Sequence, residues 1–299
     1  MSYLEHIQRC NQFVREQFLP FFIGEQCLGL THKDHVIHLL KWPDVFYVDH
    51  QGLHLNPTLN TPESRTDAVN RVVYALHQQG IIESWLSEQY SVSQHFQGDS
   101  LMCIERAATA FLGVRGYGIH VNGLVRKKDG IHVWVATRST HKPSYPGMLD
   151  QIVAGGQPAG ISLMDNLIKE AAEEAGIPAD IATQASFAGE IHYCAATSRG
   201  LHNGGIFVYD LWLSEDFVPH NTDGEVASFQ LLPIQEVADL VDHTTKFKDN
   251  CNLVNIDLFL RLGVINDSHP DYHAIKDALY AEPLTIKPDN TSTHNALFQ

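Results

Sequence analysis

A glycine pair leading into one acidic helix constrains this 299-residue chain more than any other feature. Residues 155–162 read GGQPAGIS, and residues 163–177 read LMDNLIKEAAEEAGI. Ser162 is a good N-cap residue, and Gly176 stands where a helix end favours a left-handed residue. The pattern therefore predicts a helix that begins after Ser162, ends at Gly176 and is entered from a glycine loop.

Three glutamates share one side of this predicted helix. At about 100° per residue, Glu170, Glu173 and Glu174 fall within an arc of roughly 100°, opposite the apolar half. Most charge clusters of this kind are solvated acidic faces. Here, however, the adjacent glycines let the backbone pass close to the helix, so that the carbonyl of Gly155 can point at the glutamates. Carboxylates and a carbonyl form a hard-oxygen site suited to Mg²⁺ or Mn²⁺, completed by substrate phosphate.

The spacing of these residues resembles the Nudix box. Gly155 matches its first glycine, Glu170 matches the glutamate of its arginine–glutamate pair, and Glu173 and Glu174 match its glutamate pair. The resemblance implies an α+β chain: a Nudix α/β/α sandwich with a mixed sheet, a small N-terminal α+β domain and C-terminal helices. It also implies that Gly155, Glu170, Glu173 and Glu174 bind the metal.

Two positions depart from the Nudix pattern. Ile161 stands where the family has glutamate, and Lys169 stands where it has arginine. In the family these two residues pair and brace the loop against the helix. Because the carboxylates are retained, the departures affect the expected bracing more than the expected metal chemistry.

A narrower resemblance rests on residues 148–156 (MLDQIVAGG) and 168–177 (IKEAAEEAGI). These words are similar to the Nudix region fused to some eukaryotic thiamine pyrophosphokinases. That branch implies Mg²⁺-dependent hydrolysis of damaged (oxo or oxy) thiamine diphosphates to monophosphates. Alternatives are a Nudix hydrolase of a nucleoside diphosphate derivative such as ADP-ribose or NADH, a non-catalytic ligand-sensing module, and an α+β domain with a merely acidic surface helix.

The resemblance also suggests roles for residues outside the box. Glu225 lies in a loop before the last strand, where family members often have a further metal ligand or general base. We therefore expect Glu173, Glu174 and Glu225 to be the catalytic residues, with either Glu173 or Glu225 taking the proton from the attacking water. Arg138 and Lys142 precede the box strand and are candidate phosphate contacts.

Charge and composition narrow the class of partner. The formal net charge is −15, with 44% hydrophobic and 18% charged residues, as in an ordinary globular protein. A small-molecule diphosphate substrate is therefore expected, and neither nucleic acid nor an anionic membrane surface. The five scattered cysteines and the lack of a targeting or membrane-spanning pattern predict free thiols in a cytoplasmic protein. The oligomeric state stays open, with a homodimer as one alternative.

Three regions are expected along the chain. Residues 1–114 predict an N-terminal α+β domain with a role in substrate recognition, including helices over 3–18 and about 61–79 and a hairpin around residues 49–52. Residues 115–245 predict the Nudix domain, with alternating strands over 117–125 and 131–138. Residues 246–299 predict C-terminal helices over 252–262 and 272–280, and a disordered tail from Pro288.

Overall fold

The computed structural model describes residues 1–142 and 144–284 as two compact units. The first unit contains residues 1–12, 117–193 and 204–283. The second unit contains residues 13–116 and 194–203, together with Leu284. Across the described ranges, no helix is long and apolar enough to cross a membrane. The predicted tail from Pro288 lies outside the described residues.

A seven-stranded sheet organises the first unit, with the order β11-β12-β7-β8-β13, β10 paired to β7 and β9 paired to β8. Its strands are β7 (Arg115–Lys127), β8 (Gly130–Arg138), β9 (Leu149–Asp150), β10 (Val153–Gly156), β11 (Ser186–Thr197), β12 (Gly200–Leu213) and β13 (Val226–Pro233). The two strands predicted around the turn at residues 127–130 are confirmed as the antiparallel pair β7 and β8.

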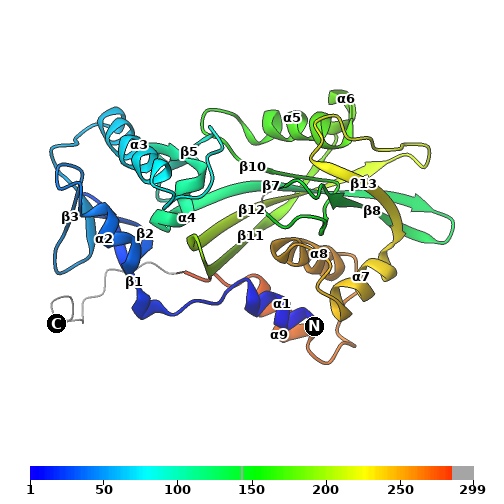
Figure 1. The fold of residues 1–299 in the computed structure, drawn as a ribbon. Coiled ribbons are helices and arrows are strands. Elements are labelled where there is room, and N and C mark those ends of the chain that lie inside the picture. The colour runs from blue at the N-terminus through cyan, green and yellow to red at the C-terminus, as the bar shows by residue number, and fades with distance from the viewer. Residues whose placement is uncertain (143, 285–299) are drawn as a thin grey trace. The chain divides into compact units, whose positions relative to one another are not determined.

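Helices cover both faces of this sheet (Figure 1). They are α1 (Tyr3–Arg9), α5 (Leu163–Ala175), α6 (Ala179–Ala182), α7 (Ile234–His243), α8 (Asp249–Arg261) and α9 (Tyr272–Leu279). α5 lies over one face, and α8 lies on the other. Because strand side chains alternate between faces, neighbouring residues of β7 serve different helices. The expected α+β fold is confirmed, and the glutamate helix α5 lies with the short helix α6 on one face of the sheet (Figure 1).

The main core of the first unit lies on the α8 face. Nine consecutive residues of α8, Cys251–Phe259, are buried. The six apolar ones among them pack with apolar side chains of β8, β11, β12, α1, α7 and α9. Fully burying one large apolar side chain stabilises a fold by about 1.5–3 kcal/mol. α8 is consequently a central structural element and not an appendage to the sheet.

The first helix is shorter than the sequence pattern predicted. α1 ends at Arg9, and Cys10 is its C-cap residue, so the helix predicted over residues 3–18 is wrong beyond its first two turns. The chain passes from the first unit to the second after Gln12, and strand β1 begins at Phe18. Although residues 1–114 were predicted as one domain, α1 packs against α8 and α9.

The second unit contains a four-stranded sheet, a two-stranded sheet and several helices. The elements are β1 (Phe18–Ile23), β2 (Gln26–His32), α2 (Lys33–Leu39), β3 (Phe46–Val48), β4 (Leu53–Leu55), α3 (Pro62–Gln78), β5 (Gln89–Val92), β6 (Met102–Glu105) and α4 (Thr109–Leu112). The predicted hairpin is confirmed as the antiparallel pair β3 and β4. The predicted helix over 61–79 is confirmed as α3, which Thr61 caps.

Truncating Phe259 should test the packing of α8. Its ring is fully buried and meets the ring of Tyr3 edge-on, with 6.2 Å between the centroids. Phe259→Ala should lower the free energy of unfolding by about 3–5 kcal/mol, because it removes buried surface and leaves a cavity. Urea unfolding followed by circular dichroism measures this. Val218→Ala, at a 71% exposed site, is the control and should change stability by about 0.5 kcal/mol or less.

Candidate active site

Helix α5 begins and ends as its sequence predicted. The Ser162 hydroxyl accepts a hydrogen bond from the backbone N–H of Asp165 at 3.1 Å, which satisfies one of the free donors of the first turn. Gly176 adopts the left-handed conformation, with φ of 62°, and ends the helix. Leu167, Ala171 and Ala175 are buried, and this packing fixes the rotation of the helix about its axis. The directions in which the glutamates leave the helix are thereby fixed as well.

Gly155 and Glu170 are in direct contact. β10 pairs antiparallel with β7, with Gly155 opposite Ile119, and this pairing holds the glycine under the helix. A Cβ atom added to Gly155 would lie 2.5 Å from Cδ of Glu170 and 2.8 Å from its Oε2. Only glycine fits at this position, because any side chain would displace the Glu170 carboxylate.

Glu174 is the most buried of the three glutamates. It is 6% exposed, and its Oε2 accepts a hydrogen bond from the N–H of Ala154 at 2.8 Å. Burial raises the pKa of Glu174 well above its usual value, and the negative charges of Asp150, Glu170 and Glu225 raise it further, while the Ala154 N–H opposes the shift. A buried carboxylate among other carboxylates is a place where a cation is strongly favoured.

Lys169 lies between the two other glutamates of the helix. Its Nζ is 3.0 Å from Glu170 Oε1 and 3.0 Å from Glu173 Oε2. Partial burial acts to lower the pKa of Lys169, but hydrogen bonds to Glu173 and Glu170 outweigh this effect and raise the pKa. Lys169 therefore offsets carboxylate charge on the helix itself, whereas the family arginine in this position was expected to brace the loop.

An amide pair braces the glycine loop instead. Asn166 is fully buried, and its Nδ2 donates to the carbonyl of Gly156 at 2.7 Å and to Oε1 of Gln157 at 3.1 Å. The Nε2 of Gln157 in turn donates to the carbonyl of Ile161 at 2.8 Å. Neither residue was predicted from the sequence. The available signal was an asparagine inside a helix, where its side chain is disfavoured unless it bonds elsewhere.

The predicted site residues outside the box are Lys142, Glu225 and Arg138, and they make two separate ionic contacts. Lys142 forms an ion pair with Glu225, and the backbone N–H of Ser139 donates to the carbonyl of Glu225 at 2.8 Å. Glu225 thus lies in the loop before β13, as expected, and its charge acts on Glu174. Arg138 is separate from this pair, because its guanidinium is bound inside the protein to Asp150 at 2.8 Å.

Arg138 makes three hydrogen bonds with its side chain. Besides Asp150, it donates to the carbonyls of Ser144 at 3.0 Å and Tyr145 at 3.2 Å, and its side chain is 11% exposed. Phosphate contact by Arg138 would require some of these bonds to break. Of the predicted site residues, the structure places Gly155 against Glu170, with Glu174 bound to the neighbouring Ala154 N–H. Glu173 is paired with Lys169, Glu225 is paired with Lys142, and Arg138 is bound to Asp150.

Comparison with known proteins identifies the family. A model of a domain of unknown function, DUF4743, matches residues 2–116. The chain is 42% identical over 275 residues to Nudix hydrolase 24, chloroplastic, of Arabidopsis thaliana, covering 91% of this chain and 75% of that protein. It is 41% identical over 282 residues to Nudix hydrolase 20, chloroplastic, of the same plant, with the same coverage. This chain belongs to the Nudix hydrolase family.

Among solved structures, a MutT protein from Methanosarcina mazei Go1 is similar over 50% of this chain and 96% of its own, with 17% identity and a TM-score of 0.38. The family assignment rests on the two Arabidopsis sequence relatives. The chain is a Nudix diphosphate hydrolase, and the expected family is confirmed. The sensor and purely structural alternatives are thereby set aside.

The donor set of this Nudix hydrolase fits a divalent cation. The Glu170 carboxyl lies against Gly155, and the Glu174 carboxyl is bound to the neighbouring Ala154 N–H. Glu173 directly precedes Glu174 on the helix. All of these donors are hard oxygens, which suit Mg²⁺ and Mn²⁺ and not softer metals. The burial of Glu174 next to other carboxylates supplies the physical reason for a cation here.

Removing the Asn166 amide should weaken the loop. Asn166→Ala leaves the buried Gly156 carbonyl without its donor, and Asn166→Asp replaces that donor with an acceptor. Each change should cost about 1–3 kcal/mol of stability and lower turnover, because Gly155 loses its fixed position. Thermal unfolding and steady-state kinetics measure the two effects. The control is Gln184→Ala, which removes an exposed amide bond to the Asp180 carbonyl and should leave both unchanged.

Proposed function

We propose that this Nudix hydrolase uses Mg²⁺ to cleave an organic diphosphate to the monophosphate, and that damaged thiamine diphosphates are its substrate class. The observation that carries the proposed chemistry is the contact of Gly155 with Glu170, next to the buried Glu174 on the Ala154 N–H. The substrate class rests on the sequence words at residues 148–156 and 168–177 alone.

In this proposal, Glu170 and Glu174, with Glu173 and the Gly155 carbonyl, hold the Mg²⁺. A metal held there would supply positive charge opposite the diphosphate and would favour ionisation of a bound water. The protein's own contribution is positional: β10 and the Asn166 amide fix the glycine backbone, and α5 fixes the carboxylates. Such pre-organisation removes the need for the site to rearrange during the reaction.

Two carboxylates are candidates for the general base. Glu173 has a side chain that is 46% exposed and is paired with Lys169, whereas Glu225 is 43% exposed and is paired with Lys142. A general base must reach the attacking water, and both side chains are partly exposed to solvent. Lys142 is the better placed phosphate contact of the two predicted cations, since its side chain is 23% exposed and Arg138 is held by Asp150.

Glutamine substitutions test the assignment of the carboxylates. Glu174→Gln keeps the side-chain shape and removes the metal-binding charge, so turnover should fall by roughly 10²-fold or more while KM changes far less. The general base is the residue, Glu173 or Glu225, whose change to Gln causes the larger loss of turnover with an unchanged dependence on the Mg²⁺ concentration. Glu236→Gln, at an exposed glutamate of α7, is the control and should keep full activity. Full activity in Glu174→Gln would show that the site lies elsewhere.

A substrate panel tests the proposed specificity. The purified protein would be incubated with Mg²⁺ and thiamine diphosphate, its oxo and oxy forms, ADP-ribose, NADH and nucleoside diphosphates, and product release would be measured. We expect the highest kcat/KM for the oxo and oxy forms. A higher value for ADP-ribose or NADH would keep the diphosphate chemistry and reject the thiamine assignment. Loss of all turnover after chelation of the metal is expected in either case.

The proposed site of action is the cytoplasm. Both Arabidopsis relatives carry the word chloroplastic in their names, which describes those two proteins. A fluorescent fusion of the full chain observed in its own cells decides the point.

A further inference from the structure

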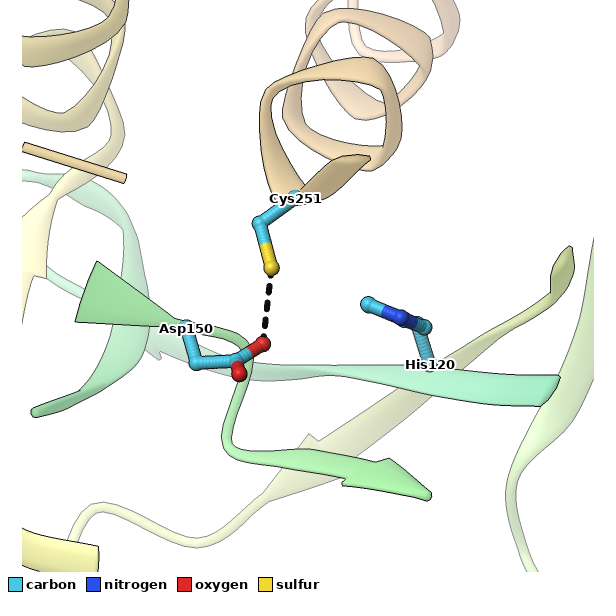
Figure 2. Close-up of side chains that lie close together, drawn as sticks. All are labelled: His120, Asp150 and Cys251. Atoms are coloured by element: carbon cyan, nitrogen blue, oxygen red, sulfur yellow. Dashed lines mark hydrogen bonds between the residues drawn. The ribbon is translucent and has the colours of Figure 1, made fainter. Parts of the chain in front are cut away.

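Three metal-binding types of side chain meet on the α8 face of the sheet, away from α5. His120 projects from β7, Asp150 ends β9, and Cys251 lies in the first turn of α8 (Figure 2). All three are buried, and their potential ligand atoms lie within 4.8 Å of one another. The Nudix chemistry derived above uses none of them.

The hydrogen bonds of Gln151 determine which nitrogen of His120 is available. Gln151 Nε2 donates to the carbonyl of Cys251 at 3.2 Å and to Oδ1 of Asn255 at 3.0 Å. Gln151 Oε1, the acceptor end of the amide, therefore faces His120 Nδ1 at 2.7 Å, so that Nδ1 carries the hydrogen. Within residues 1–142 and 144–284, Nε2 of His120 makes no hydrogen bond, although the residue is only 4% exposed.

The imidazole of His120 is neutral at neutral pH, so its Nε2 can act as a ligand to a metal ion. Burial lowers the pKa of His120 to about 4, and the charge of Lys248 adds to the effect. A histidine that metal binds through one nitrogen commonly donates from its other nitrogen to a fixed oxygen. Gln151 supplies that oxygen here, and its own orientation is fixed by α8.

Asp150 and Cys251 complete the cluster. The Cys251 thiol donates to Oδ1 of Asp150 at 2.7 Å, while Oδ2 faces Arg138 at 2.8 Å. Burial works to raise the pKa of Asp150, but Lys248, His120 and Arg138 lower it to about 2, so the carboxylate is charged at neutral pH. Burial and the Asp150 charge raise the pKa of the Cys251 thiol, which keeps its proton when no cation replaces it.

We propose that His120 Nε2, Asp150 Oδ1 and Cys251 Sγ form a second metal site, which binds one zinc-like divalent ion and ties α8 to β7 and β9. Imidazole, thiolate and carboxylate are the three ligand types of zinc sites, and their mixture disfavours Mg²⁺, which takes oxygen ligands. Its three ligands are distinct from the carboxylates on α5, although the charge of Asp150 also acts on Glu174.

The charge balance of binding identifies Lys248 as an opposing group. The ion brings two positive charges, and the thiol releases one proton as the metal–sulfur bond forms, so the buried cluster gains one positive charge. Lys248 Nζ is 3.6 Å from Asp150 Oδ2, and its side chain is 17% exposed. Movement of the Lys248 ammonium group toward solvent would offset the positive charge that the cluster gains. Removing this ammonium should therefore strengthen metal binding.

Cobalt(II) is a suitable probe, because cobalt bound to thiolate has a charge-transfer absorption in the near ultraviolet. The full chain, stripped of metal, would be titrated with Co²⁺ in excess Mg²⁺, which occupies the carboxylate site. We expect one equivalent of Co²⁺ to give this absorption and Zn²⁺ to displace it. Zn²⁺ at about 100 times its dissociation constant should also raise Tm by roughly 5 °C.

Matched cysteine variants locate the ion. Cys251→Ser should lose the absorption and the rise in Tm, while Cys194→Ser, at another fully buried cysteine outside the cluster, should keep both. Circular dichroism checks that each variant is folded. Lys248→Met, at a partly exposed position, should bind Co²⁺ about tenfold more tightly in the folded protein.

Several results would overturn the second site. They are the absence of a thiolate absorption in the wild-type chain, its persistence in Cys251→Ser, its loss in Glu174→Gln, and unchanged or weaker binding in Lys248→Met. None of them bears on hydrolysis, since turnover with Mg²⁺ is measured separately. Conversely, failure of the substrate panel would leave the cobalt result intact.

Discussion

The close approach of α5 to β10 is the contact on which the active site depends. At Gly155 the strand has no side chain, and the Glu170 carboxyl occupies the space that a Cβ would fill. One residue earlier, the Ala154 N–H reaches Glu174 and holds it in the interior. Two carboxylates are thus fixed by the backbone of a single short strand. A shift of β10 by one residue would remove both contacts together, because alternate strand residues face opposite ways.

The glutamates of α5 are like charges close together, and their repulsion is reduced in two different ways. Lys169 neutralises the outer part of the helix by pairing with Glu170 and Glu173. Within the described residues no lysine pairs with Glu174, whose carboxyl group accepts a hydrogen bond from the Ala154 N–H. Its raised pKa reflects burial and neighbouring charges, and a divalent cation would favour the ionised form. Metal binding and the ionisation of Glu174 are therefore coupled by electrostatics.

The opposite face of the sheet is polar in a region where a core is normally apolar. The carboxylate of Asp150 is contacted by the side chains of Arg138, Lys248 and Cys251, and it accepts a hydrogen bond from the backbone N–H of Gln151. Buried charges are tolerated only when they are paired or bound to metal. Because Asp150 ends β9, four residues before Ala154, the segment that delivers the glycine backbone to α5 is anchored from beneath by this cluster.

Much of this arrangement follows from local sequence. Four features depend on residues that are neighbours in the sequence and could therefore be predicted without a structure. They are the caps of α5, the side of α5 that carries the glutamates, the glycine at position 155 and the β7–β8 hairpin. The same holds for α3 and for the hairpin at residues 49–52. The first helix was predicted too long, because the pattern of apolar residues does not reveal that the chain passes to another unit after Gln12.

Contacts between distant residues were decided by the tertiary structure alone. The Asn166–Gln157 brace depends on how the loop folds back, and the pairing of Arg138 with Asp150 depends on strands 12 residues apart along the chain. The group of His120, Asp150 and Cys251 joins residues up to 131 positions apart (251 − 120), and no spacing rule predicts such a meeting. The sequence by itself determined which chemical groups the α5 site contains, because that site is built within one helix and its preceding strand. Only the folded sheet decided which partner each buried charge has, because burial and pairing arise from packing between separate elements.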